Sequence, residues 1–315
     1  MGAYLVKRFL LMILTLVGMS IIIFVLLWLM PGNITVIMFD SAGFINPAEM
    51  AAIEKELGLD LAIIPQYFYW IHGLVTWDLG ISYVTEMPVI DELAPRIPIT
   101  AKLAALALCF SILFGLPLGV ISAVKQDTLL DYIVRVVSLS GLSLPSFWLA
   151  LLILMFFVYA FGTIPIYLEP PDNFWDELLI YSVPAAAVGF RSSSLIMRLT
   201  RSSILEVIRQ DYIRTARAKG ASNNVVHYRH ALRNAMLPLT TIIGLETVFM
   251  MGGLVVIETV FNIPGMAYFL VEAIEVRDYP IVRNLVMLMA FITVSINFMV
   301  DMIYALLDPR IRYTE

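Results

Sequence analysis

The sequence predicts an all-α integral membrane protein with six membrane-spanning helices. Three properties of its 315 residues carry this prediction: 60% are hydrophobic, the mean hydropathy is +0.88, and only 14% are charged. A soluble domain usually has about 25% charged residues. The net charge of −5 argues against a nucleic-acid-binding protein, and the single cysteine, Cys109, excludes a disulfide framework.

The sequence lacks the short motifs that supply common enzyme chemistry. It has no G-x-x-x-x-G-K-[ST] phosphate loop, no G-x-S-x-G nucleophile elbow and no H-E-x-x-H zinc motif. We therefore expect no catalytic residues, no metal and no cofactor in this chain. If the protein does energy-driven work, another chain must supply the nucleotide chemistry.

The first apolar run, residues 9–30, is longer than the roughly 20 residues that a bilayer-spanning helix needs. Lys7 and Arg8 precede it, as basic residues precede a signal peptide core, but the run is too long for such a core and has no small-x-small cleavage site. We expect an uncleaved span. Membrane helices tolerate proline, so the three prolines within the later runs do not divide them. The later spans are expected at 99–124, 132–160, 177–199, 238–262 and 281–307.

Basic residues indicate the orientation of these spans. The segment 198–233 holds eight Arg or Lys and two acidic residues, whereas residues 31–98 hold two basic and nine acidic residues. Basic residues also precede the first span and follow the last one. We therefore expect a multi-pass protein of the inner (cytoplasmic) cell membrane, with both termini and the 198–233 segment in the cytoplasm and residues 31–98 outside.

The outward region contains a helix start, because Asn46 can cap a helix whose first residue is Pro47. Gly58 is a suitable stop, which predicts a short amphipathic helix at 47–57. The aromatic stretch QYFYWIHGLVTW, residues 66–77, follows it. Two interpretations stay open: a small cap that rests on the membrane interface, and an interfacial aromatic belt with no further role.

The segment DYIRTARAKGASNNVVHYRHALRNAMLP, residues 211–238, is polar and basic between two apolar runs. Its composition predicts a helix across 203–219, which Gly220 ends by permitting a left-handed turn. Ser222 is a good N-cap for a second helix from 223 to 236. This segment either docks another protein or is a positive-inside loop that contacts anionic lipid. The ordered turn with its small residues favours docking.

His227 and His230 lie three residues apart and could share one face of the second helix. No Asp, Glu or Cys lies within a turn to complete a metal site, and Arg229 and Arg233 add positive charge. We therefore interpret both histidines as structural or surface residues.

Residues 206–238 resemble the cytoplasmic loop of ABC-importer permeases, and in particular that of the dipeptide, oligopeptide and nickel permease family. Asn33 stands where the family usually has Asp, and residues 214–216, Arg-Thr-Ala, stand where the general importer motif has Glu-Ala-Ala. The second departure, and the long spacing from Gly220 to Pro238, are usual in the peptide branch. Shorter resemblances extend over nearly the whole chain: PGN at 31–33, LGLD at 57–60, QYFYW at 66–70, DLGIS at 78–82, ETVFNIPGM at 258–266, RDYP at 277–280 and LDPRIR at 307–312.

The resemblance implies a permease of a type I ABC importer, with a cytoplasmic coupling helix between the fourth and fifth spans. Its partners would be a second, often non-identical permease, two ABC ATPase subunits and an extracytoplasmic substrate-binding protein. The family takes up peptides, nickel chelates, glutathione and some oligosaccharides, and we expect peptide here. The residues that couple to the ATPase would be Thr215, Ala216, Ala218, Lys219, Gly220, Ala221, Ser222 and Asn223.

The expected organisation is an N-terminal span (1–30), an outward region (31–98), a permease core (97–308) with its coupling loop at 200–237, and a cytoplasmic tail (309–315). Two other classes fit less well. A secondary transporter would show repeated halves with broken helices. A membrane-embedded hydrolase would need a nucleophile with its base, or a metal cluster, inside the spans.

Two ionisable residues are expected at membrane depth, where a charge is costly and usually faces a partner or a wet cavity. Arg191 lies eight residues before the end of the fourth span and Glu246 eight after the start of the fifth, so both lie about 12 Å from the same membrane face. We expect them to pair, and they either line the substrate pathway or hold the two spans together. Glu258 and Asp301, near span ends, are expected to be structural.

Overall fold

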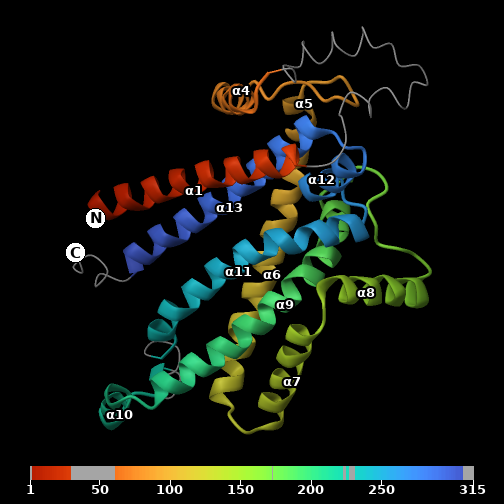
Figure 1. Cartoon of the computed structure of the whole chain (residues 1–315). Coiled ribbons are helices and arrows are strands. Elements are labelled where there is room, and N and C mark those ends of the chain that lie inside the picture. Colours follow the sequence, from red (N-terminus) through yellow and green to blue (C-terminus); the bar gives the residue numbers. More distant parts are fainter. Residues whose placement is uncertain (1, 30–60, 172, 223–224, 227–230, 308–315) are drawn as a thin grey trace. The chain divides into compact units, whose positions relative to one another are not determined.

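A computed structural model describes residues 2–29, 61–171, 173–222, 225–226 and 231–307. Within these ranges the chain is helical, and its one β-type pairing is an isolated bridge between Ile81 and Pro88. The helices, labelled as in Figure 1, are α1 (Gly2–Trp28), α4 (Ile63–Thr76), α5 (Val89–Leu93), α6 (Arg96–Val124), α7 (Leu129–Ser143), α8 (Ser146–Phe161), α9 (Phe174–Ile208), α10 (Asp211–Ala218), α11 (Leu232–Val260), α12 (Met266–Glu275) and α13 (Tyr279–Leu307).

Among the described residues, five helical stretches are long and apolar enough to cross a membrane, and a sixth span results if α7 and α8 count as one. The prediction of a multi-pass, all-α membrane protein is therefore confirmed. Helix α9 has 35 residues, or about 52 Å, so it extends well beyond a hydrocarbon core of about 30 Å. The five stretches are Tyr4–Trp28, Val89–Val124, Phe174–Ile208, Leu232–Val260 and Tyr279–Ile303.

The third span differs from its prediction as one helix over 132–160. The chain bends by 110° between α7 and α8. Leu144 has an extended backbone (φ −87°, ψ 127°), as does Pro145. The residue before a proline is pushed out of the helical region, and the proline itself has no N–H to donate, so a helix ends readily there. Pro117 and Pro184, by contrast, lie inside the continuous helices α6 and α9.

The chain forms two compact units. The first comprises Met1–Arg8, Thr100–Pro264 and Ser295–Glu315, and the second comprises Phe9–Ile99 and Gly265–Val294. In the first unit, α6 and α9 approach closely through glycine. A Cβ atom at Gly119 would lie 2.6 Å from Cβ of Thr200, and one at Gly189 would lie 2.7 Å from the Ala107 carbonyl oxygen. Small residues permit such close packing of membrane helices.

In the second unit, an apolar core joins the short helix α5 to α12 and α13. The aromatic stretch of α4 also contributes a core residue: Trp70 is 3% exposed, and its indole N–H donates to Oδ1 of Asn284 at 2.9 Å. Asn284 in turn donates to the Leu79 carbonyl at 2.8 Å. The amphipathic helix predicted at 47–57 lies outside the described residues. The core side chains are Val89, Leu93, Met266, Phe269, Ala273, Ile281, Val282 and Leu285.

Candidate functional site

The candidate coupling segment begins where α9 ends. The structure corrects the prediction of one helix over 203–219, because α9 stops at Ile208 and α10 starts at Asp211. Gln210 between them has an extended backbone (φ −71°, ψ 148°), so the chain turns there. Ile213, the first aliphatic residue of α10, is fully buried. Burial of this side chain outweighs the weak local preference for a continuous helix.

The end of α10 is closed by its own backbone, as the Gly220 prediction requires. Gly220 has φ +84°, a left-handed conformation that glycine adopts without steric cost. Its N–H donates to the Arg217 carbonyl at 2.9 Å, and the Ala221 N–H donates to the Ala216 carbonyl at 3.1 Å. These two hydrogen bonds form a Schellman motif with Gly220 in the left-handed position.

The rest of α10 and its turn face outward. The predicted coupling residues from Thr215 to Ser222 are exposed or half-buried, whereas Ile213 fixes the opposite side of the helix. Nδ2 of Asn234 donates to the Tyr212 hydroxyl at 2.7 Å, which ties α10 to the first turn of α11. The Val226 N–H donates to the Ser222 carbonyl at 3.0 Å. The second helix predicted at 223–236 is not separate from the fifth span in its described part, because α11 runs from Leu232 through Pro238 to Val260. Asn223 and both histidines of the second helix lie outside the described residues.

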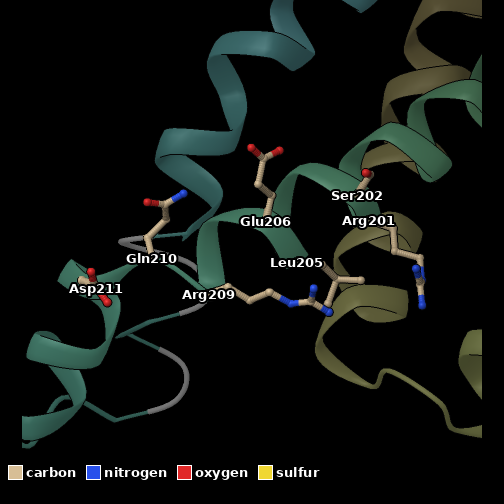
Figure 2. A pocket seen from close by; sticks show the side chains of 7 residues that line it. All are labelled: Arg201, Ser202, Leu205, Glu206, Arg209, Gln210 and Asp211. Atoms are coloured by element: carbon tan, nitrogen blue, oxygen red, sulfur yellow. The ribbon is translucent and has the colours of Figure 1, made fainter.

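An open pocket of about 540 Å³ lies at the corner between α9 and α10 (Figure 2). This pocket was not predicted, although the spacing of its lining residues is visible in the sequence. Its lining residues on α9 and at the C-cap of that helix recur every four positions, and this spacing places them on one side of a helix. They are Arg201, Leu205 and Arg209 in one row and Ser202 and Glu206 in the next, followed by Gln210 and Asp211 at the corner.

Arg191 and Glu246 meet, as the sequence predicts. Nη1 of Arg191 lies 3.5 Å from Oε2 of Glu246, and the Ser192 hydroxyl donates to the same oxygen at 2.5 Å. The Glu246 side chain is only 4% exposed, whereas 47% of Arg191 is exposed. A buried carboxylate therefore holds a half-exposed guanidinium between α9 and α11.

A second ionic cluster, which the sequence analysis missed, surrounds Asp131 near the start of α7. The Asp131 carboxylate is fully buried and accepts two hydrogen bonds from Arg201, at 2.8 and 2.9 Å. It also accepts one from the Ser122 hydroxyl at 2.5 Å and one from the Asp127 N–H at 3.0 Å. The partners Asp131 and Arg201 are 70 residues apart, so their pairing shows no local sequence pattern.

The acids near span ends also have partners. The Thr100 hydroxyl donates to Oε1 of the buried Glu258 at 2.7 Å, and Arg8 lies 3.1 Å from Asp301. Both contacts fit the structural roles expected for these acids. Among the described residues, no group of three or more His, Cys, Asp or Glu side chains could hold a metal ion.

Comparison with known proteins shows which class of membrane protein has this architecture. The family described as "Binding-protein-dependent transport system inner membrane component" matches residues 115–313, and its N-terminal counterpart, described as "Binding-prot-dependent transport system membrane comp, N-term", matches residues 1–104. Among solved structures, a chain of the MetNI methionine ABC transporter, in inward-facing conformations, matches with a TM-score of 0.55 and 18% identity. That match covers 70% of this chain and 98% of that one, and it concerns the fold alone.

Relatives of nearly the same length are similar throughout. The dipeptide transport system permease protein DppB of Alkalihalophilus pseudofirmus is 37% identical over 336 residues, which covers 99% of this chain and all of the relative. DppB of Escherichia coli is 35% identical over 337 residues, with 99% of each chain covered. The glutathione transport system permease protein GsiC of Pectobacterium atrosepticum is 36% identical over 313 residues, with 98% of this chain and 99% of the relative covered.

The helical membrane fold and these matches define a transport component and not an enzyme. The chain belongs to the family of binding-protein-dependent transport system inner membrane components, the permeases of ABC importers.

Proposed function

We propose that this chain forms half of the translocation pathway of an ATP-driven importer for di- or oligopeptides. An extracytoplasmic binding protein would deliver the peptide, a second and non-identical permease would form the other half, and two ABC ATPase subunits would hydrolyse ATP. The full-length similarity to two dipeptide permeases supports this substrate class. Glutathione is itself a tripeptide, so the relative named for glutathione transport favours the same class.

The same proposal places the chain in the inner membrane with both termini in the cytoplasm. The positive-inside distribution of Arg and Lys supports this orientation. It puts α10 and the Gly220 turn on the cytoplasmic side, where the ATPase subunits work.

The coupling role of α10 rests on one observation: a short helix anchored by Ile213 and closed by Gly220 presents small, exposed residues outward. A Cβ atom at Gly220 would meet no other atom within 4 Å, so the space beside it is open to a partner. In the proposed cycle, closure of the ATPase dimer on ATP pushes this helix and so shifts the pathway between its inward and outward states. That shift requires the ATP-bound ATPase to favour one of the two states.

Bulk added to the outward face of α10 tests the coupling role. Ala218→Trp should weaken docking, because Ala218 is exposed and an indole ring at this position would occupy the space that the docking partner needs. Gln126→Trp is the matched control, since Gln126 is exposed in the turn between α6 and α7. We expect Ala218→Trp to lower the ATPase rate stimulated by peptide-loaded binding protein about tenfold, which corresponds to 1.4 kcal/mol of docking free energy. An Ala218→Trp rate equal to that of the control would refute the coupling role.

We further propose that Arg191 faces the substrate pathway. Its half-exposed guanidinium is the charged group of the pair that remains accessible, while Glu246 is buried beneath it. Arg191→Gln should therefore change the KM for acidic peptides relative to basic peptides, because it removes a positive charge from the path. Uptake measured with both peptide types separates the roles. A merely structural role predicts less folded protein and an unchanged KM ratio.

A further inference from the structure

A second pocket, of about 270 Å³, lies in the first compact unit between α7 and α9. Three of its nine lining residues are arginines, namely Arg135, Arg198 and Arg201, and none is acidic. Three serines add hydroxyl groups to the same wall. The volume is slightly below the usual range of small-molecule sites, about 300–1,000 Å³, so it suits a headgroup and not a whole peptide.

The positive charge of this pocket is only partly balanced. Asp131 binds Arg201 through two hydrogen bonds, and the charge of Asp127 acts on the same guanidinium. Nε of Arg135 lies 3.6 Å from Asp131, too far for a hydrogen bond, and its Nε and Nη2 are buried without a hydrogen-bond partner in the described ranges. Arg198 forms no ion pair with a carboxylate of the described residues. Arg135 also lies over the Tyr132 ring at 4.2 Å. One carboxylate, that of Asp131, is therefore shared by Arg135 and Arg201, and an anion could bind Arg198 together with the unused donor atoms of Arg135.

The surroundings of the pocket are apolar. Along α7, Ile133, Val136 and Leu139 are 49%, 66% and 56% exposed, and Leu139 also lines the pocket. Arg198 lies at the end of the span predicted at 177–199, which is the depth of lipid headgroups. A cationic pocket at this depth beside an exposed apolar helix face matches a molecule with an anionic head and apolar chains.

We propose that this pocket binds the headgroup of an anionic phospholipid. Its phosphate lies between Arg135 and Arg198, which donate charge-assisted hydrogen bonds, and its acyl chains lie along the exposed face of α7. The ligand satisfies the buried donor atoms of Arg135. The ATPase is expected at α10 and not here. This inference goes beyond the transport function and does not depend on the substrate.

The test uses the purified permease together with the subunits that co-purify with it, stripped of lipid by detergent. Phosphatidylglycerol, phosphatidylcholine and inorganic phosphate are added in turn, and bound phospholipid is counted by native mass spectrometry. Arg198→Gln is the main variant, because its exposed side chain has no ion pair that the fold requires. Arg209→Gln removes the same charge at the exposed C-cap of the same helix, outside this pocket, and is the control.

We expect phosphatidylglycerol to bind and phosphatidylcholine not to bind. Arg198→Gln should weaken binding about fivefold, the contribution of one basic residue near an anionic headgroup, and Arg209→Gln should leave it unchanged. Equal binding of both lipids overturns the proposal. So does inorganic phosphate that displaces the lipid completely at millimolar concentration, because the pocket is then a free phosphate site. Loss of a co-purifying subunit in Arg198→Gln, with lipid binding unchanged, overturns it in favour of a protein contact.

Discussion

Replacement of Arg201 by methionine would leave the Asp131 carboxylate buried without its main partner. Asp131 is fully buried and receives two of its hydrogen bonds from Arg201, at 2.8 and 2.9 Å. Removal of one partner from a buried ion pair costs about 3–5 kcal/mol. The Ser122 hydroxyl still donates to the carboxylate after the change, and Arg135 lies 3.6 Å away. We therefore expect the lower end of that range, about 3 kcal/mol of unfolding free energy.

Removal of the charge on the other partner, Asp131, should cost less unfolding free energy. In Asp131→Asn the arginine remains, and its side chain is 20% exposed, so water can reach part of it. The loss of hydrogen bonds to a charged group then corresponds to about 1.5–3 kcal/mol. Arg214→Met is the matched control, because Arg214 forms an exposed ion pair with Asp211 and such pairs contribute at most about 1 kcal/mol.

The assay is unfolding of the purified chain in mixed micelles by increasing SDS, followed by tryptophan fluorescence. The expected order of destabilisation is Arg201→Met, then Asp131→Asn, then Arg214→Met. If Arg201→Met proves no more destabilising than the Arg214→Met control, the network around Asp131 does not stabilise the fold as argued.

Two further predictions use the same assay. Gly119→Ala should destabilise the fold by about 1–3 kcal/mol, because the new methyl group overpacks the contact of α6 with α9. Gly252→Ala is the control and should be neutral or stabilising, because a Cβ atom there meets nothing within 4 Å. Equal effects of the two substitutions would contradict this account. Asn284→Leu should cost about 1–3 kcal/mol, because it leaves the buried indole N–H of Trp70 without its acceptor, and the cost should shrink in the Trp70→Phe background if the hydrogen bond is its cause.

The sequence predicted the apolar spans well because membrane depth demands long runs of apolar residues. It could not place the bend at Pro145. Pro145 and Pro184 both lie in apolar runs, yet α9 continues through Pro184 and the chain turns by 110° beside Pro145. A membrane helix tolerates a proline only where its neighbours satisfy the freed backbone groups, and those neighbours come from distant parts of the chain.

Some features of the candidate site could likewise be predicted from the sequence, and others could not. The Gly220 turn was predictable because a left-handed C-terminal residue favours glycine, and the pairing of Arg191 with Glu246 followed from equal membrane depth. The break at Gln210 was not predictable, because no local helix breaker marks it and burial of Ile213 decides it. The contact of Asp131 with Arg201 was not predictable either, because no sequence pattern relates two charged residues near the ends of different spans.

The two hydrogen bonds that close α10 lie within the segment itself, so its end holds its shape with no partner bound. A subunit that bound α10 and the described turn, residues 211–222, would therefore lose little conformational entropy in ordering them. In the proposed transport cycle, such a contact would form and break at a small cost in free energy. In the proposed coupling role, a displacement of the Gly220 end would pass to the buried Ile213 and to the hydrogen bond between Asn234 and Tyr212 without a prior rearrangement of the turn.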